Sequence, residues 1–173
     1  YQAVLIGTDS KTDVAIISIT PEEGREFSPA VIGTASSLRL GQTVIAIGNP
    51  LGELGGTVTD GIISSLAREV AMEGSGSMTL LQTNAAVSPG NSGGGLFNMA
   101  GELIGVVNAK SSGTGIEGLG FAIPINDALD IANELIRLVD MSDDGLMNAE
   151  YLGEIAARFP RQIKRIGARQ VPD

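Results

Sequence analysis

Residues 83–97 of the chain read TNAAVSPGNSGGGLF, and one hydroxyl in this stretch, that of Ser92, stands within a run of glycines. Apolar, strand-like segments lie on both sides of the run. Glycine tolerates backbone conformations and close approaches that other residues cannot adopt. A serine there can be held on a tight turn with neighbouring N–H groups directed at a ligand oxygen, as acyl transfer requires. The alternative is a glycine-rich hairpin with an incidental serine, because the chain holds 24 glycines.

The pattern of apolar segments predicts an all-β chain that closes as an antiparallel barrel. Short strand-like segments follow one another at even spacing, punctuated by glycine and proline. A helical pattern begins only at Asn126, whose side chain can cap the helix, with Asp127 in its first turn. The strands are expected over residues 13–19 and near 29–33, 43–48, 57–66, 78–83, 94–98 with 102–109, and 119–124.

The composition is that of a globular domain with an acidic body. The chain has 173 residues, 43% of them hydrophobic, and a net charge of −9. Residues 1–157 carry a net charge of −13 and residues 158–173 one of +4, and this acidity argues against nucleic acid as a main partner. No apolar run is long enough to span a membrane. The absence of cysteine removes disulfides and thiolate chemistry.

No cofactor or metal is predicted for this chain. Residues 113–118 read GTGIEG and match the dinucleotide-binding pattern G-x-G-x-x-G. That motif requires a helix to follow, so that the helix N-terminus meets the pyrophosphate. The residues that follow, GFAIP at 120–124, have the pattern of a strand. The match is therefore interpreted as a coincidence in a glycine-rich chain.

The stretch around Ser92 resembles the nucleophile loop of trypsin-like serine proteases, and most closely that of the HtrA/Deg branch. The resemblance rests on GNSGG at 90–94, on Leu96 and Phe97 after it, and on GELIGVV at 101–107. It extends over residues 3–139. It implies a serine endopeptidase that cleaves unfolded or extended polypeptides in protein quality control.

The resemblance also implies how the chain is divided. The fold is expected to be a trypsin-like (chymotrypsin-type) antiparallel β-barrel with the second barrel complete and the first only partly present. Residues 1–27 would be the last strands of the first barrel and the inter-barrel loop, and residues 28–125 the second barrel with the nucleophile loop. Residues 126–139 would be the C-terminal helix, and residues 140–173 form a tail of unknown role.

By match to the family motif, Ser92 is the expected nucleophile and the N–H groups of Gly90 and Ser92 the expected oxyanion hole. Asp13, in the segment TDVAII at 12–17, matches the triad aspartate, whose role is to orient the catalytic histidine. The alternative for Asp13 is a turn aspartate that accepts hydrogen bonds from turn amides.

The same match gives expectations for substrate recognition. Ala86 occupies the floor of the S1 pocket, so the pocket should accept a small or medium apolar side chain. Asn108, Ala109 and Lys110 match the strand edge that pairs with the substrate backbone. Two residues depart from the family pattern, because Asn84 replaces an aspartate and Gly95 replaces a proline or alanine. Both are expected to affect the order of the loop around Ser92.

The position before the nucleophile also differs from many trypsin relatives. Asn91 stands where they have an aspartate that pairs with a newly cut N-terminus. Asparagine is uncharged and cannot form that ion pair. Activation by N-terminal trimming is therefore not expected.

The chain contains no histidine, the usual general base for a serine nucleophile. A serine–lysine dyad with Lys11, Lys110 or Lys164 finds no support in the surroundings of these lysines. We therefore expect the histidine to come from a segment upstream of Tyr1, and the chain alone to be inactive. The alternative is a non-catalytic pseudoprotease or peptide-binding module of the same fold.

Family analogy supplies the remaining expectations. HtrA-like proteases act on polypeptides and commonly form trimers, so a homotrimer is one assembly that the resemblance allows. They are mostly periplasmic, secreted or otherwise associated with the bacterial cell envelope. None of these properties follows from the residues themselves.

Overall fold

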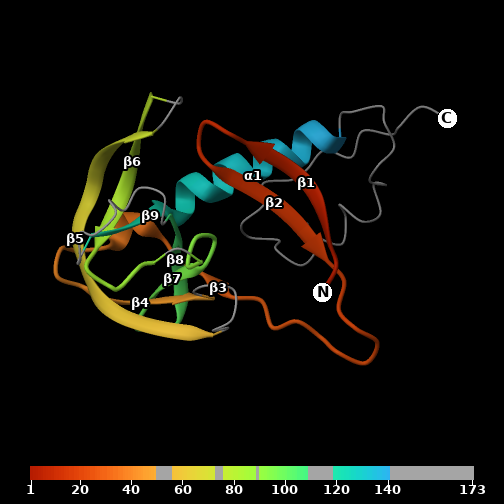
Figure 1. The fold of residues 1–173 in the computed structure, drawn as a ribbon, viewed down its shortest axis with the longest axis horizontal. Helices are drawn as coiled ribbons and strands as arrows, with labels where there is room; N and C mark the ends of the chain where they lie inside the picture. The colour runs from red at the N-terminus through yellow and green to blue at the C-terminus, as the bar shows by residue number, and fades with distance from the viewer. Residues whose placement is uncertain (50–55, 73–75, 89, 109–118, 141–173) are drawn as a thin grey trace. The chain divides into compact units, whose positions relative to one another are not determined.

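The computed structural model describes residues 1–49, 56–72, 76–88, 90–108 and 119–140. Within these ranges the chain forms nine strands, a short 3₁₀ helix and one α-helix (Figure 1). The described residues divide into two compact units, one within residues 29–128 and one of residues 1–28 with 129–140. In the described ranges, no helix is both long and apolar enough to cross a membrane.

The larger unit is a closed β-barrel. Its strands are β3 (Val31–Ile32), β4 (Thr43–Gly48), β5 (Thr57–Met72), β6 (Gly76–Thr83), β7 (Gly95–Asn98), β8 (Glu102–Val107) and β9 (Gly120–Pro124). Neighbours run in the order β8-β7-β4-β5-β6-β9, and β9 pairs with β8 again to close the ring (Figure 1). Every pairing within the ring is antiparallel. The strand β3 joins the edge of β8 in parallel.

Alternation of side chains along the strands places the core inside this ring. On β4, Val44 and Ala46 are buried while Thr43 and Ile47 are exposed. Every second side chain of β4 therefore lies in the barrel interior, where it meets buried side chains of the other strands. The buried cluster consists of Leu38, Val44, Ala46, Ile63, Leu81, Ala85, Leu96, Ile104, Val107 and Ala122.

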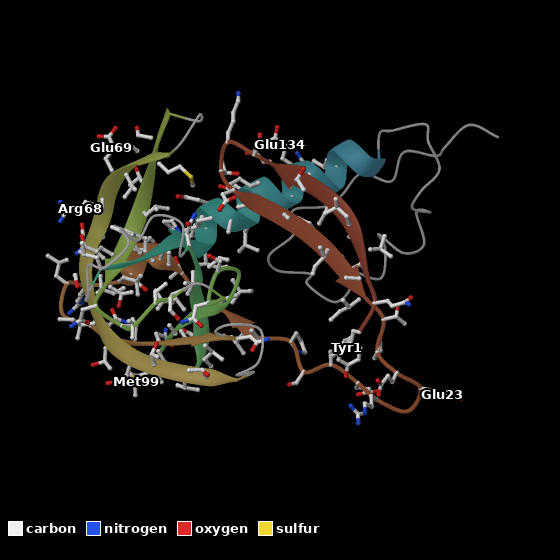
Figure 2. All side chains as sticks on the ribbon, viewed as in Figure 1. Tyr1, Glu23, Arg68, Glu69, Met99 and Glu134 are labelled. Carbon is white, nitrogen blue, oxygen red and sulfur yellow. The ribbon has the colours of Figure 1, made fainter. Side chains whose placement is uncertain are left out.

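The hairpin of β5 and β6 is longer than the sequence predicted. The strand pairing continues beyond Arg68 and Leu80 to Met72 and Gly76. Polar side chains support this extension, because Arg68 Nε donates to Gln82 Oε1 at 3.0 Å and Ser77 Oγ donates to Glu69 Oε1 at 2.7 Å. Figure 2 shows Arg68 and Glu69 on this part of β5. The apolar pattern ends earlier, so it could not indicate the full length of the hairpin.

The helix α1 (Ile125–Asp140) begins directly after β9. The sequence predicted Asn126 as a cap, but the helix already includes this residue. Its Oδ1 accepts the Ala35 N–H at 2.8 Å and the Thr34 hydroxyl at 3.4 Å, beside the 3₁₀ helix at Ala35–Ser37. The side chain therefore joins two segments that lie 91 residues apart in the sequence instead of capping its own helix.

Replacing Asn126 by alanine is expected to lower the free energy of unfolding by about 1 kcal/mol, because the Ala35 N–H loses its acceptor. Asn126→Asp keeps the oxygen and is the matched control, expected to lie within about 0.5 kcal/mol of wild type. Urea denaturation followed by circular dichroism measures both. Equal stability of Asn126→Ala and wild type would show that this bond contributes nothing.

The smaller unit contains the antiparallel pair of β1 (Ala3–Asp9) and β2 (Val14–Ile19). Leu5 lies opposite Ile17 on one face of this pair. Leu5, Ile17 and Ile19 are 62%, 59% and 41% exposed. Ile6, at the register shift between Leu5 and Gly7, is buried. Gly7 packs against α1, since a Cβ at this position would lie 3.3 Å from Leu135 Cβ.

Candidate active site

Ser92 lies at the surface of the barrel unit, directly after a tight turn. The turn is closed by the Asn91 N–H, which donates to the Ser88 carbonyl oxygen at 3.0 Å. Gly90, its third residue, has a φ of 98°. A positive φ of this size favours glycine over other residues. Gly90, two residues before Ser92, therefore allows the backbone conformation of the turn that leads to the exposed serine.

Hydrogen bonds fix the loop after Ser92 to β8. The Gly93 N–H donates to the Val107 carbonyl oxygen at 2.9 Å, and the Val107 N–H donates to the Gly94 carbonyl oxygen at 2.8 Å. The Gly94 N–H donates to the Asn91 carbonyl oxygen at 2.9 Å. Gly93 has a φ of 81°, a second left-handed residue that allows this path. Ser92 is thus held between two turns.

The loop also lies directly on the end of β4. A Cβ on Gly94 would overlap the Ile47 carbonyl oxygen and lie 3.2 Å from Gly48 Cα. The side chain of Asn91 is buried beside Gly48. Both contacts leave no room for a larger residue, which explains part of the glycine content of residues 90–95.

The segment expected to form the substrate pocket is fixed to β5. The Thr59 hydroxyl donates to the Ala86 carbonyl oxygen at 2.9 Å, and the Ile62 N–H donates to Asn84 Oδ1 at 2.7 Å. Ala85 between them is buried and Ala86 is exposed. Asn84 therefore supplies the same kind of acceptor oxygen as the aspartate it replaces. The substitution leaves this segment anchored.

Asn108, the first residue of the expected substrate-pairing edge, is buried, with 3% of its surface exposed. Its N–H donates to the Phe121 carbonyl oxygen at 2.8 Å and so continues the pairing of β8 and β9. Ala109, Lys110 and the GTGIEG stretch at 113–118 lie outside the described residues, as do Pro89 and the tail from residue 141.

Gly95, the second departure from the family pattern, has a packing reason. A Cβ at this position would overlap the ring of Phe97 and lie 2.9 Å from Leu103 Cδ1. The Phe97 ring fills the space that a proline or alanine would use. The absence of a side chain at Gly95 therefore leaves room for the Phe97 ring in this chain.

Asp13 belongs to the smaller unit, while Ser92, Gly90, Ala86 and Asn108 belong to the barrel. Asp13 is exposed at the end of the turn that leads into β2 and has a φ of 56°, a left-handed conformation that is uncommon outside glycine. The carboxylate of Asp9 holds this turn through two hydrogen bonds. It accepts the Lys11 N–H at 3.1 Å and the Thr12 hydroxyl at 2.7 Å.

The Thr12 hydroxyl, followed by the Lys11 N–H, holds the pKa of Asp9 below its ordinary value. The turn is therefore stabilised above the pKa of the unfolded carboxyl, about 3.9, and loses this contribution as the pH falls through the lower folded value. Thr12→Val is expected to raise the pKa of Asp9 toward its ordinary value, as measured by NMR titration. Thr8→Val is the control, because it makes the same change directly before Asp9 and should leave the pKa of Asp9 unchanged. An equal shift of this pKa in both variants would show that the Thr12 hydroxyl is not its cause.

Comparison with known proteins now identifies the family. The model of the trypsin-like peptidase domain matches residues 1–106. The chain belongs to the trypsin-like peptidase family. It is 41% identical over 175 residues to the serine protease Do-like HtrB of Bacillus subtilis, covering 99% of this chain and 34% of the relative. It is 48% identical over 169 residues to a probable periplasmic serine endoprotease, DegP-like, of Rickettsia prowazekii, covering 96% and 31%.

Solved structures agree with this membership. The HtrA-type protease AlgW with a decapeptide is 39% identical to this trypsin-like chain, with a TM-score of 0.66 over 78% of this chain and 40% of AlgW. The predicted HtrA-type resemblance and the predicted all-β, trypsin-like fold with a C-terminal helix are therefore confirmed. The chain spans about a third of the length of the curated relatives it matches.

The sequence did not indicate the roles of three residues, two in the barrel unit and one in the smaller unit. Thr59 binds the pocket segment from a strand 27 residues away, and Gly48 makes room for Asn91. Asp9 holds the turn before Asp13. Only Asp9 had a local signal, since an aspartate two residues before a turn N–H is a common turn acceptor.

Proposed function

We propose that this chain is part of an HtrA-type serine endopeptidase in which Ser92 is the nucleophile and Asp13 orients the catalytic histidine. The N–H groups of Gly90 and Ser92 form the oxyanion hole. The substrates are unfolded or extended polypeptides, and the histidine comes from a segment outside this sequence.

The geometry of the loop around Ser92 carries this proposal. Ser92 is exposed, and the turns on both sides of it are closed by main-chain hydrogen bonds. The N–H groups of Asn91, Gly93 and Gly94 bind carbonyl oxygens of the protein. A nucleophile on a preorganised loop loses little freedom when it reacts, and such preorganisation is what acyl-transfer sites require.

The reaction would follow the general course of serine hydrolases. Ser92 Oγ attacks the scissile carbonyl carbon and gives its proton to the histidine, while the carbonyl oxygen becomes an oxyanion. The carbon–nitrogen bond then breaks, and the leaving amine takes the proton from the histidine. Water hydrolyses the acyl-enzyme by the same sequence and returns the proton to Ser92. Asp13 would stabilise the histidine in its charged form.

The surface of the smaller unit supports a histidine-bearing segment from elsewhere. The chain has no histidine of its own. Leu5, Ile17 and Ile19 form an exposed apolar face on the pair of β1 and β2. A two-stranded sheet with an exposed apolar face is marginally stable and gains from further strands. We infer that the missing segment covers this face, and that the chain without it is inactive.

We further propose that the pocket prefers small or medium apolar side chains. Ala86 is exposed and carries no charge, so it offers no partner to an arginine or lysine. Its carbonyl oxygen is held by Thr59, which fixes the pocket segment. The edge at Asn108, Ala109 and Lys110 would pair with the substrate backbone. The similar HtrA-type protease AlgW was solved with a decapeptide, which supports an extended peptide as ligand. By the same analogy we propose the bacterial cell envelope as the location and a homotrimer as the assembly.

The absence of histidine also favours a second candidate, a pseudoprotease or peptide-binding module of the same fold. The experiment joins to Tyr1 the corresponding upstream segment of the Bacillus subtilis relative, which the family pattern expects to carry the histidine. This completed protein should cleave an unfolded casein, and a peptide with valine before the scissile bond faster than one with arginine. Peptide binding without cleavage by the folded, completed protein would favour the second candidate.

A further inference from the structure

The side chain of Asn91, directly before the proposed nucleophile, is buried, and its amide oxygen lacks a hydrogen-bond partner among the described residues. It is 4% exposed, and among the described residues no donor reaches its Oδ1. Burying an amide oxygen without a hydrogen bond is unfavourable. Other contacts of the loop must therefore offset the free-energy cost of burying this oxygen.

Gly48, at the end of β4, provides the space for this side chain. A Cβ on Gly48 would overlap Asn91 Oδ1 and would lie 2.9 Å from both Cγ and Cα of Asn91. One residue earlier, the Ile47 carbonyl oxygen lies where a Cβ of Gly94 would be. We call the Ile47–Gly48 end of β4 the socket. Asn91 and Gly94 pack on the socket from the two sides of Ser92.

The main chain of Asn91 takes part in both turns that hold Ser92. Its N–H donates to Ser88, and its carbonyl oxygen accepts the Gly94 N–H. A displacement of the Asn91 side chain from the socket would therefore disturb both turns and the position of Ser92 between them.

We propose that Asn91 is the positioning residue of the nucleophile loop, and that it holds the loop through a neutral amide packed in the socket. The proposal rests on the proposed function only in taking Ser92 as the nucleophile. The loop is then held because the uncharged Asn91 side chain packs closely against Gly48. A charged side chain at position 91 would leave the socket for solvent.

The described surroundings of Asn91 contain no compensating charge. The strand β4 and residues 83–98, apart from Pro89, carry no ionisable side chain. On β8 the only one is Glu102, which accepts a hydrogen bond from Asn98 Nδ2 at 2.7 Å at the far end of that strand. Glu53 and Lys110 lie outside the described residues. A carboxylate in the socket would thus be buried without a partner, which raises its pKa.

The test compares Asn91→Asp with Asn84→Asp by amide hydrogen exchange at pH 4.5 and pH 7.5. Protection of the Gly93, Gly94 and Val107 amides is compared with that of the wild type at the same pH. Because burial raises the pKa of the introduced carboxyl, Asn91→Asp should lower the protection of these amides about 100-fold at pH 7.5 and only about fivefold at pH 4.5. The Ile63 amide, which binds the Gln42 carbonyl oxygen, should remain protected.

Asn84→Asp is the matched control, since Asn84 Oδ1 accepts the Ile62 N–H and an aspartate keeps that oxygen. It should leave all these amides within about threefold of wild type at both pH values. Protection at Gly93 and Val107 that is unchanged in Asn91→Asp at pH 7.5, or is lost equally in Asn84→Asp, would overturn the proposal.

A second pair of variants covers the case in which Asn91→Asp fails to fold. Gly48→Ala should lower protection of the same amides, because its Cβ meets the Asn91 side chain. The double variant Gly48→Ala/Asn91→Ala lacks Oδ1 and Cγ of Asn91, and it should regain at least part of the lost protection. Such a non-additive result is expected only for groups in contact. Strictly additive losses would overturn the proposal. Neither test depends on cleavage, so the proposed function can fail while this inference stands.

Discussion

Ser92→Ala in the completed protein is expected to lower the rate of peptide cleavage by about 10⁴-fold or more. The substitution removes the oxygen that attacks the substrate and leaves the main chain of the loop unchanged. The remaining rate would come from binding and from the oxyanion hole. The measurement is the steady-state cleavage of a fluorogenic peptide with valine before the scissile bond, with kcat and KM determined separately.

Ser88→Ala provides the matched control in the same loop. Ser88 is also exposed, and the contact that the structure gives it with Asn91 uses its carbonyl oxygen, which alanine retains. Its cleavage rate should stay within about threefold of wild type, as for surface substitutions away from a site. If Ser92→Ala kept a tenth of the activity, or Ser88→Ala lost as much as Ser92→Ala, Ser92 would not be the nucleophile.

Gly61→Ala is expected to have the largest effect on stability, lowering the free energy of unfolding by about 3 kcal/mol. A Cβ at this position would overlap the main-chain nitrogen of Ala85 and lie 2.7 Å from its Cα and from Asn84 Oδ1. Main-chain atoms of a paired segment cannot move aside without breaking the contact of β5 with the pocket segment. Urea denaturation of the chain measures the loss.

Gly41→Ala separates this collision from the general cost of replacing a glycine. Gly41 has a φ of 78°, but nothing lies within 4 Å of a Cβ built there. Its replacement should cost only the backbone strain, about 1 kcal/mol. A loss in Gly61→Ala no larger than that in Gly41→Ala would mean that β5 and the pocket segment do not pack as described.

The parts of the fold that sequence alone could predict are those with local signals. A short run of apolar and β-branched residues before a glycine indicated β4, and the glycine run indicated the turns around Ser92. The start of α1 was predicted within one residue, because Pro124 ends β9 and Asp127 suits the first turn. These signals lie within a few residues of the elements that they specify.

The remaining features depend on residues that are distant in sequence. Asn126 binds Ala35 instead of its own helix, and Asn84 binds Ile62. The contact of Asn91 with Gly48 joins a loop to the end of a strand 43 residues away in the numbering. The sequence around each of these residues does not indicate its partner, because the partner comes close only when the barrel closes. The contacts that position the loop of Ser92 could therefore not be predicted from the sequence. Ser92 itself was singled out by its glycine run and stays the predicted nucleophile.

Intact-mass analysis after treatment with a fluorophosphonate tests the central claim most directly. It would be applied to the chain alone and to the completed protein. We predict one adduct, on Ser92, in the completed protein, and none within the same time on the chain alone, because only the first has a histidine to take the serine proton. A folded, completed protein without an adduct, or with its adduct on another residue, would contradict the assignment of Ser92 as the nucleophile.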